Sequence, residues 1–316
     1  MSEPGSYIEN VYGHTLADLG AEVPELVVLD SDLQRATETE FFRSRFPERY
    51  FDLGIQEANM IGVAAGLALA GKTVFCGTFA CFISQRALDQ AAISLAYCQS
   101  NVKLVGVEAG LVSGRNGASH QAMLDLAIFR ALPQMSVLVA ADAVETRQIL
   151  HYLAKEHKGP AYLRVERGKV PVVLDPDNYH FQFGRAMTVR EGSDLTIITA
   201  GVMVARSLKA AELLAAEGIS ARVLNLSTLK PLDVEAIQAA ANQTGAIVVA
   251  ENHSIYGGLF GAVSEVVCQS RLVPVERIGV EDCFGEVGSV QYLAEKFGLT
   301  AAHIAAAVYR VLQRKG

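Results

Sequence analysis

The sequence predicts an α/β protein made of two doubly wound domains, residues 1–180 and 181–316. Short runs rich in Val, Ile and Leu alternate with longer segments of helical periodicity, which is typical of parallel sheets covered by helices. The periodicity is lost over residues 168–183, which contain two prolines, and the alternation resumes at Leu195. A chain of 316 residues is long enough for two domains that each have a core.

Each expected element follows from a local pattern. The strands predicted for the first domain are 26–30, 72–76, 102–107, 136–140 and 161–164. Its predicted helices are 7–20, 54–71, 83–99, 121–131 and 143–155. Residues 37–50 read as a surface connection, 77–82 as a strand-exit loop, and 108–120 as a long glycine-rich loop whose Ser119 caps the next helix. For the second domain the strands are 195–199, 221–226, 246–250 and 276–280, and the helices are 203–217, 233–241, 258–268 and 302–313.

The composition narrows the class of protein. It is 51% hydrophobic with a mean hydropathy of +0.25, apolar enough for another chain to cover part of the surface. A net charge of −7 without a basic run argues against nucleic acid as a partner, and no apolar run is long enough to span a membrane. The first residues lack a secretory signal, so we expect a cytoplasmic protein. Its five cysteines are expected to be reduced, packed thiols: Cys76, Cys81, Cys98, Cys268 and Cys283.

Glu57 lies in the first turn of the nearly all-apolar helix that begins at Gly54. A carboxylate on a buried helix is costly unless it is paired or protonated. Glu57 therefore either stabilises the helix N-terminus or is a functional acid. The sequence alone leaves both readings open.

Other side chains at predicted element ends also have two readings. Phe79 and Phe82 form either core packing or an aromatic wall for a flat heterocycle. His120 is either a surface or capping residue, or an acid/base near a helix N-terminus. Arg164 and Arg167 either pair with Glu166 or Glu156, or recognise an anion. Motifs of P-loop, dinucleotide, metal and nucleophile-elbow type are missing, so these residues alone do not define a reaction.

Several segments, in their order and spacing, resemble the pyrimidine-binding half of transketolases. They are 54–57, 77–82, 117–121, 129–133 and 141–145. Segments 251–259 and 279–282 resemble the C-terminal domain of the same family. The Gly-Asp-Gly motif of the other half of transketolase is missing. The resemblance therefore implies the C-terminal subunit of a split, thiamine-diphosphate-dependent transketolase, with a pyrimidine-binding domain and a transketolase C-terminal domain.

The resemblance also implies partners. An N-terminal subunit would carry the diphosphate-binding domain and hold Mg²⁺, or Ca²⁺, so that this chain has no metal site of its own. Self-association would give an α2β2 heterotetramer, and the small residues Ala64, Ala65 and Gly66 would let the Glu57 helix pack closely against its twin. Small-molecule ketones and aldehydes would be the substrates.

Roles carried over from the family fall on particular residues. Glu57 would hydrogen-bond to N1′ of the aminopyrimidine and so activate the cofactor, and His120 would contact sugar oxygens. The remaining residues expected to bind the cofactor are Asp32, Leu33, Ile55, Phe79, Phe82 and Arg86. Those expected near the substrate are Glu108, Arg115, Asn116, Arg164 and Arg167.

Departures from the family pattern affect the substrate and not the cofactor. Glu108 occupies the place of a phosphate-binding His, Asn116 that of an Asp on the donor sugar, and Ala36 that of a phosphate-binding Ser. A carboxylate repels phosphate, so ordinary pentose phosphates are disfavoured.

We therefore expect a two-chain transferase that moves a ketol or acyl unit from a ketone donor to an aldehyde-type acceptor. One alternative is the β subunit of a 2-oxo acid dehydrogenase. Another is a carboligase similar to deoxyxylulose phosphate synthase, which also carries an Arg near the position of Arg86. A non-catalytic partner subunit is a third alternative, which the presence of Glu57 disfavours.

Overall fold

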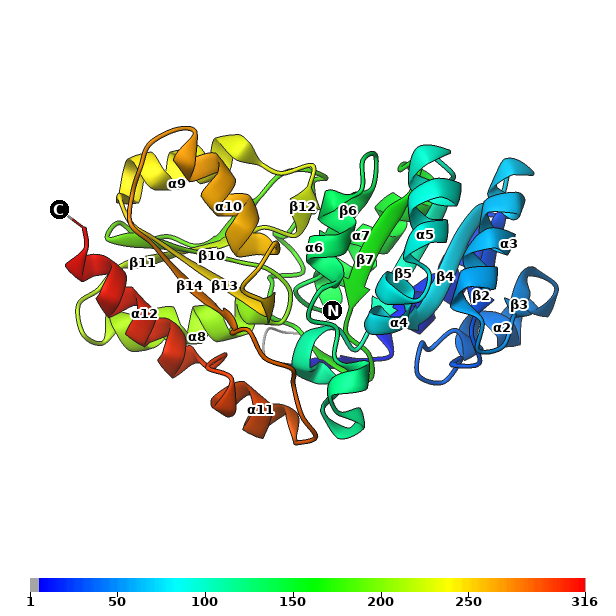
Figure 1. The fold of residues 1–316 in the computed structure, drawn as a ribbon, viewed down its shortest axis with the longest axis horizontal. Helices are drawn as coiled ribbons and strands as arrows, with labels where there is room; N and C mark the ends of the chain where they lie inside the picture. The colour runs from blue at the N-terminus through cyan, green and yellow to red at the C-terminus, as the bar shows by residue number, and fades with distance from the viewer. Residues whose placement is uncertain (1–5, 316) are drawn as a thin grey trace. The chain divides into compact units, whose positions relative to one another are not determined.

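The computed structural model describes residues 6–315, which form two compact units (Figure 1). One unit contains the described residues up to Ala109 together with Ile128–Phe181, and the other contains Gly110–Ala127 together with the residues from Gln182 onward. Both units are built on mainly parallel sheets with helices, so the predicted α/β fold class is confirmed. Residues 1–5, where the sequence predicts no secretory signal, lie outside the described part.

Six strands of the first unit form a parallel sheet in the order β6-β7-β5-β4-β2-β3. They are β2 (Leu26–Asp30), β3 (Tyr50–Asp52), β4 (Thr73–Phe79), β5 (Val102–Val107), β6 (Ser136–Val139) and β7 (Ala161–Val165). All residues of β2, β4, β5 and β7 are buried, as expected for central parallel strands. A separate antiparallel pair joins β1 (Tyr7–Glu9) to β8 (Lys169–Pro171).

Helices connect these strands. They are α1 (Val11–Glu22), α2 (Glu40–Arg45), η1 (Pro47–Arg49), α3 (Glu57–Leu69), α4 (Ala80–Gln85), α5 (Leu88–Gln90), the π-helical η2 (Ala91–Tyr97), α6 (Asp125–Ala131) and α7 (Ala143–Lys155). Helix α1 packs against α2 and α7, while α3 packs against η2.

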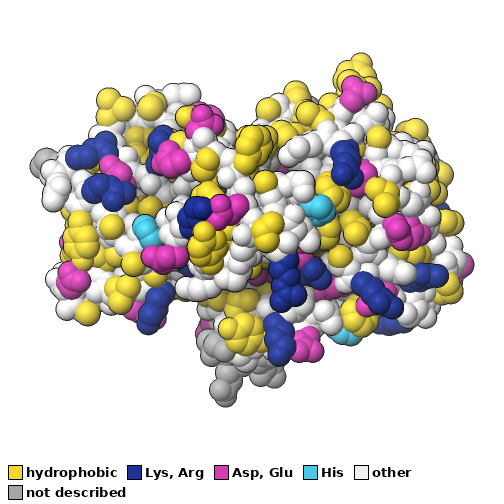
Figure 2. All heavy atoms as spheres, turned by 60° about the horizontal axis from the view of Figure 1, so that its bottom comes forward, with side chains coloured by type: hydrophobic (Ala, Val, Ile, Leu, Met, Phe, Trp, Pro, Cys, Tyr) yellow, Lys and Arg dark blue, Asp and Glu magenta, His cyan; other side chains and the backbone are white. Residues whose placement is uncertain are grey.

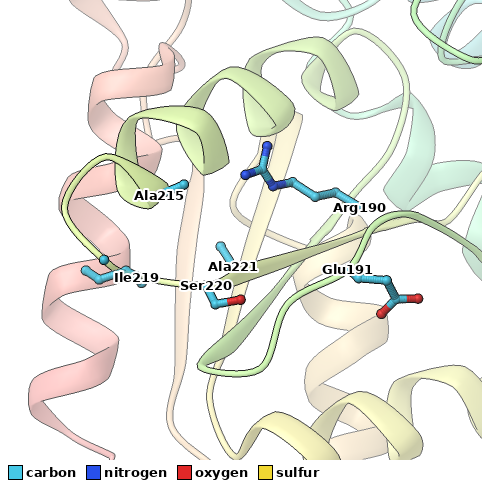
Figure 3. Close-up of a pocket in the computed structure, with 7 residues that line it drawn as sticks. Arg190, Glu191, Ala215, Ile219, Ser220 and Ala221 are labelled. Carbon is cyan, nitrogen blue, oxygen red and sulfur yellow. The ribbon is translucent and has the colours of Figure 1, made fainter.

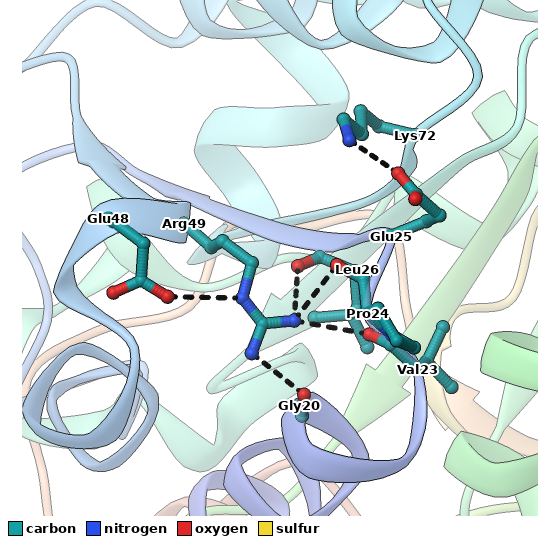
Figure 4. Close-up of polar contacts among 8 residues, drawn as sticks. All are labelled: Gly20, Val23, Pro24, Glu25, Leu26, Glu48, Arg49 and Lys72. Carbon is teal, nitrogen blue, oxygen red and sulfur yellow. Dashed lines mark hydrogen bonds and ion pairs between the residues drawn. The ribbon is translucent and has the colours of Figure 1, made fainter.

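Arg49 secures the carboxyl end of α1 (Figure 4). Its guanidinium donates to the carbonyl oxygens of Gly20 at 2.8 Å, Pro24 at 3.1 Å and Val23 at 3.2 Å. The Gly20 carbonyl lies in the last turn of α1 and has no partner inside the helix, and a cation is favoured at this end of the helix dipole. Arg49 thereby ties the connection before β3 to the turn before β2.

The second unit has a five-stranded sheet in the order β14-β13-β10-β11-β9. Its strands are β9 (Met187–Arg190), β10 (Leu195–Thr199), β11 (Ala221–Asn225), β13 (Ile247–Ser254) and β14 (Val275–Val280), and β12 (Thr228–Lys230) follows β11 in the chain. In Figure 1, α9 (Val234–Thr244) and α10 (Leu259–Cys268) cover one face, and α8 (Met203–Ala215) and α12 (Ala301–Gln313) cover the other. Before α12 the chain forms α11 (Val290–Lys296).

Glu251 stabilises the N-terminus of α10 in the second unit. Its two carboxylate oxygens accept hydrogen bonds from the backbone N–H groups of Leu259 at 2.7 Å and Phe260 at 3.0 Å. Negative charge is stabilised at a helix N-terminus, so Glu251 caps α10. A Cβ at Gly258 would lie 2.1 Å from Oε2 of Glu251, which explains why glycine is needed there.

Several predicted elements differ from the structure. The opening helix 7–20 is instead β1 followed by α1, because Asn10 takes a left-handed conformation (φ 51°) that turns the chain between them. The exit loop predicted at 77–82 is wrong, since β4 lies between two strands and continues to Phe79, where α4 follows directly. The long loop contains three short turns, η3 (Gly110–Val112), η4 (Gly114–Asn116) and η5 (Ala118–His120). Ser119 therefore lies in η5 and caps no helix, because α6 begins only at Asp125.

The surface of α3 also corrects an expectation. Ala64 and Ala65 are buried inside the chain, so they cannot contact a second copy. Gly62 and Gly66 are exposed with open space around them, as are the side chains of Ile55 and Leu69.

All five cysteines are free thiols. Cys76 and Cys81 are buried as predicted, and burial raises the pKa of the Cys76 thiol. Cys98, Cys268 and Cys283 are exposed, so the prediction of packing was wrong for these three, which lie at or beyond element ends.

The outer surface carries charges of both signs. On the face drawn in Figure 2, Lys and Arg side chains lie among Asp and Glu side chains and do not form a continuous basic stripe. Within residues 6–315, no helix is both long enough and apolar enough to cross a membrane.

Candidate active site

Most of the predicted cofactor residues follow the carboxyl ends of neighbouring strands in the first unit. Asp32 and Leu33 come after β2, Glu57 comes after β3, and Phe79 ends β4. Since all these strands run parallel, their carboxyl ends meet at one edge of the sheet. Ligands of open α/β sheets bind at such an edge.

Glu57 and Phe82 meet through Arg86. The Nη1 atom of Arg86, at the end of α4, donates to Oε1 of Glu57 at 3.1 Å. The same guanidinium lies over the ring of Phe82, with Cζ 3.8 Å from the ring centroid. Phe82 in turn packs against Phe79 with a centroid distance of 5.6 Å and tilted rings. The structure thus brings a carboxylate, an arginine and an aromatic pair into one cluster, which we call the Glu57 cluster.

The environment of Glu57 disfavours a purely capping role. Its side chain is only 4% exposed, whereas that of Arg86 is 50% exposed. Within the part of the chain that the structure describes, Arg86 is the partner of the carboxylate, and no backbone N–H of α3 donates to it. A buried carboxylate is normally satisfied by several donors. Glu57 therefore retains hydrogen-bonding capacity in a partly aromatic environment.

Asp30 holds the loop that carries Asp32 and Leu33. It is fully buried, and it accepts hydrogen bonds from Leu33 N at 2.6 Å, Thr37 Oγ1 at 2.6 Å and Thr39 Oγ1 at 2.8 Å. Burial raises the pKa of the Asp30 carboxyl, and these hydrogen bonds oppose the shift. Asp30 was not predicted as a site residue, although an acid that ends a buried strand was a signal for such a role.

Asp32 has an unusual backbone. Its φ of 62° lies in the left-handed region, and Asp32 N donates to Oδ1 of Asp52 at 2.9 Å. The same oxygen accepts from Gly54 N at 2.9 Å, so Asp52 links the loop after β2 to the approach to α3. Held strain of this kind is typical of functional loops. Ile55, by contrast, is 70% exposed.

Glu108 and Arg167 form an ion pair at the same edge of the sheet. Val107 and Val165 are register partners in β5 and β7, which brings the residues after them together. Arg167 Nε donates to Glu108 Oε1 at 2.6 Å, and Nη2 also contacts this oxygen. The ion pair of Arg167 is therefore made with Glu108, in place of the predicted Glu166 or Glu156. Arg164 lies within β7 and is buried.

Residues 110–121 belong to the second unit, where they pack on the segment 285–288. Leu111 N donates to Asn252 Oδ1 at 3.0 Å, and Gly110 has a φ of 64° with no room for a Cβ beside Asn252. Gln121 Nε2 donates to the carbonyl oxygen of Glu286 at 2.9 Å. Of the predicted residues here, Arg115 and Asn116 are exposed, and His120 is half-buried with Nδ1 2.9 Å from Ser119 Oγ.

A hollow of about 200 Å³ elsewhere in the second unit lacks catalytic features. It is lined by residues of β9, the end of α8 and the start of β11. Figure 3 shows the Glu191 carboxylate turned away from the Arg190 guanidinium, so the polar groups do not converge on one point. Across residues 6–315, no cluster of three or more His, Cys, Asp or Glu could hold a metal ion.

Comparison with protein families identifies the class of both units. The family model of the transketolase pyrimidine binding domain matches residues 7–173, and that of the transketolase C-terminal domain matches residues 184–304. The chain therefore belongs to the transketolase family. This family uses thiamine diphosphate, which is the cofactor predicted from the sequence. It has the domain content of the C-terminal subunit of a split transketolase, as the sequence predicted.

Individual relatives of the chain are also named as transketolases. The chain is 44% identical over 309 residues to the 6-deoxy-6-sulfo-D-fructose transketolase subunit SqwH of Clostridium sp. (strain MSTE9), covering 98% of this chain and 95% of that protein. It is 40% identical over 269 residues to a subunit of the apulose-4-phosphate transketolase of Phocaeicola vulgatus, covering 85% of each. A solved structure titled "Split gene transketolase, inactive beta4 tetramer" superposes with a TM-score of 0.91 at 46% identity, covering 99% of this chain and 100% of that one.

Proposed function

We propose that this chain is the cofactor-activating subunit of a two-chain, thiamine-diphosphate-dependent transferase. The enzyme moves a ketol or acyl unit from a ketone donor to an aldehyde-type acceptor. The observation that carries the proposal is the Glu57 cluster, in which a nearly buried carboxylate with spare hydrogen-bonding capacity and the ring of Phe82 contact the same arginine.

The residues of this cluster fit the aminopyrimidine part of thiamine diphosphate. A flat nitrogen heterocycle needs a ring to pack against and a group that hydrogen-bonds in its plane, and Phe82 with Phe79 and Glu57 offer these. When bound, the cofactor supplies a nucleophilic carbon that adds to a carbonyl carbon. Glu57 holds a proton at its carboxyl group and donates it in a hydrogen bond to N1′ of the ring. Asp32, Leu33 and Ile55 complete the cofactor-binding set in this proposal. Arg86, which the sequence also assigns to this set, contacts Glu57 and Phe82 before the cofactor binds.

His120 is the second proposed catalytic residue, exchanging protons with oxygens of the substrate. Arg115, Asn116 and Arg164 are proposed to contribute to substrate binding. The alternatives of a 2-oxo acid dehydrogenase subunit and a deoxyxylulose-phosphate-synthase-like carboligase have less support, because the relatives described above are named as transketolase subunits.

The Glu108–Arg167 pair supports a substrate other than the ordinary pentose phosphates. Its carboxylate neutralises an arginine that would otherwise attract a phosphate group. One relative is named for 6-deoxy-6-sulfo-D-fructose and another for apulose 4-phosphate. We propose that the substrate of this chain is likewise a specialised sugar.

A partner completes the enzyme in this proposal. An N-terminal subunit carries the diphosphate-binding domain and holds Mg²⁺ or Ca²⁺, and two copies of each chain form an α2β2 heterotetramer in the cytoplasm. The exposed glycines and apolar side chains of α3 support self-association through this helix.

Replacement of Glu57 tests the proposal. In the complex with the partner subunit, Glu57→Gln should lower turnover by roughly 10²- to 10⁴-fold, the usual contribution of a positioned acid, without loss of assembly. Glu48→Gln, at an exposed glutamate of the same unit, is the control. Near-native turnover of Glu57→Gln would show that Glu57 does not activate the cofactor, and turnover by the isolated chain would disprove the need for a partner.

A further inference from the structure

Arg86 makes two contacts that belong to different neighbours. Its guanidinium covers one face of the Phe82 ring at 3.8 Å, and its Nη1 donates to the Glu57 carboxylate at 3.1 Å. A guanidinium is flat, carries N–H donors in its plane and stacks on aromatic faces. An aminopyrimidine that binds this cluster needs the same ring face and the same carboxylate.

We propose that Arg86 is a stand-in for the aminopyrimidine, occupying Phe82 and Glu57 until the cofactor displaces it. The inference rests on the proposed function, since it specifies how the chain keeps the cofactor site before binding. Arg86 is then a positioning residue, because it acts through Glu57.

The exposure of Arg86 and its place at the end of α4 allow the cofactor to displace its side chain. The side chain of Arg86 is 50% exposed, so it can leave the cluster for solvent without breaking the core. Arg86 directly follows the last residue of α4. Its backbone N–H donates to Phe82 O at 3.0 Å, and movement of the side chain does not disturb this hydrogen bond. Glu57, by contrast, is fixed in the first turn of α3 and is almost fully buried.

The exchange replaces one hydrogen-bond partner of Glu57 by another. In the free chain the Glu57 carboxyl group is hydrogen-bonded to Arg86 Nη1 at 3.1 Å, and in the bound complex it is hydrogen-bonded to N1′ of the ring. Arg86 keeps its charge and becomes hydrated in solvent.

Isothermal titration calorimetry of thiamine diphosphate, with Mg²⁺, into the complex with its partner subunit tests the proposal. An ion pair and a cation–π contact at a half-exposed arginine are together worth about a factor of ten in an equilibrium constant. Removing this competitor in Arg86→Met should tighten apparent cofactor binding about tenfold.

Arg45 offers a matched control. It is 44% exposed, it pairs with Asp18 at 2.6 Å, and it lies over the ring of Phe46 at 5.4 Å in the same unit. Arg45→Met should leave the affinity for thiamine diphosphate at its native value.

Two results would overturn the stand-in role. Weaker binding by Arg86→Met would make Arg86 a direct cofactor contact, and unchanged affinity would make it a surface residue. A failure of the proposed function is distinguishable from both, since the native complex would then bind no thiamine diphosphate.

Discussion

Replacing Lys103 by Met should change how the stability of the first unit depends on pH. Lys103 lies in β5 and is fully buried. Its Nζ donates to Asn101 Oδ1 at 2.6 Å and to Gly159 O at 2.7 Å, and it lies 3.2 Å from both the carbonyl oxygen and Nδ1 of His157. No carboxylate contacts this ammonium group among the interactions described for it.

The magnitude follows from the pKa of Lys103. Burial, together with the nearby Lys158, lowers this pKa from 10.5 to about 7. The unfolded chain therefore keeps the proton up to about pH 10, while the folded chain releases it near pH 7. Because the unfolded state binds more protons over this window, the free energy of unfolding rises with pH. Between about pH 6.5 and 9.5 the rise attributable to Lys103 is about 3 kcal/mol.

The neighbouring His157 contributes only about 0.4 kcal/mol in this window, at its lower end. Burial, with a smaller effect of Lys103, lowers the pKa of His157 from 6.5 to about 4. Its proton is thus absent from the folded chain throughout the range, and the unfolded His157 is mostly neutral above pH 6.5. A comparison made above this pH isolates Lys103.

Urea unfolding followed by far-ultraviolet circular dichroism is the assay, since the chain has no tryptophan. We expect Lys103→Met to lack the rise, so that native protein gains about 3 kcal/mol over the variant between pH 6.5 and 9.5. Lys155→Met, at an exposed lysine paired with Glu22, should run parallel to the native profile. If Lys103→Met also runs parallel, Lys103 does not titrate near neutrality and the reasoning is wrong.

Three further substitutions test other features. Glu108→Gln should free Arg167 from its ion pair and lower the KM for a phosphorylated aldehyde acceptor several-fold, with the cofactor affinity unchanged. Steady-state kinetics of the complex measure this KM, and an unchanged KM would contradict the role of the ion pair. Gly258→Ala should destabilise the second unit by about 1–3 kcal/mol, because its Cβ would meet the Glu251 carboxylate at 2.1 Å; an unchanged melting profile would show that the cap can move. Gly66→Leu should leave the fold intact but reduce self-association, measured by light scattering, whereas native assembly would exclude this face of α3 as the interface.

Regular elements of the fold were predictable because their signals are local. Helix 143–155 and strands 26–30, 102–107 and 195–199 were predicted with the bounds that the structure has. Short elements such as β1 and β8 were not predicted from the sequence. Three residues carry too little periodicity, and the pairing of these strands joins segments far apart in the chain.

For the candidate site, the sequence could indicate residues but not their pairing. Glu57 and Arg86 are 29 residues apart, and Glu108 and Arg167 are 59 apart. Their contacts depend on which strands are neighbours, which a single sequence does not specify. The resemblance to transketolases supplied candidate roles for these positions, while the register of β5 with β7 explains why Glu108 meets Arg167.

These two pairs bear on where the charge of the cofactor is neutralised. At the carboxyl edge of the first sheet, Arg86 is paired with Glu57 and Arg167 with Glu108. Each arginine is thus balanced by a carboxylate of its own chain, and a diphosphate group would find no net attraction from either pair. An aminopyrimidine, in contrast, carries little charge and needs only a ring face and a carboxyl partner. The charge balance of this edge therefore suits the pyrimidine end of thiamine diphosphate, and it supports the proposal that a partner subunit with its metal ion binds the diphosphate end.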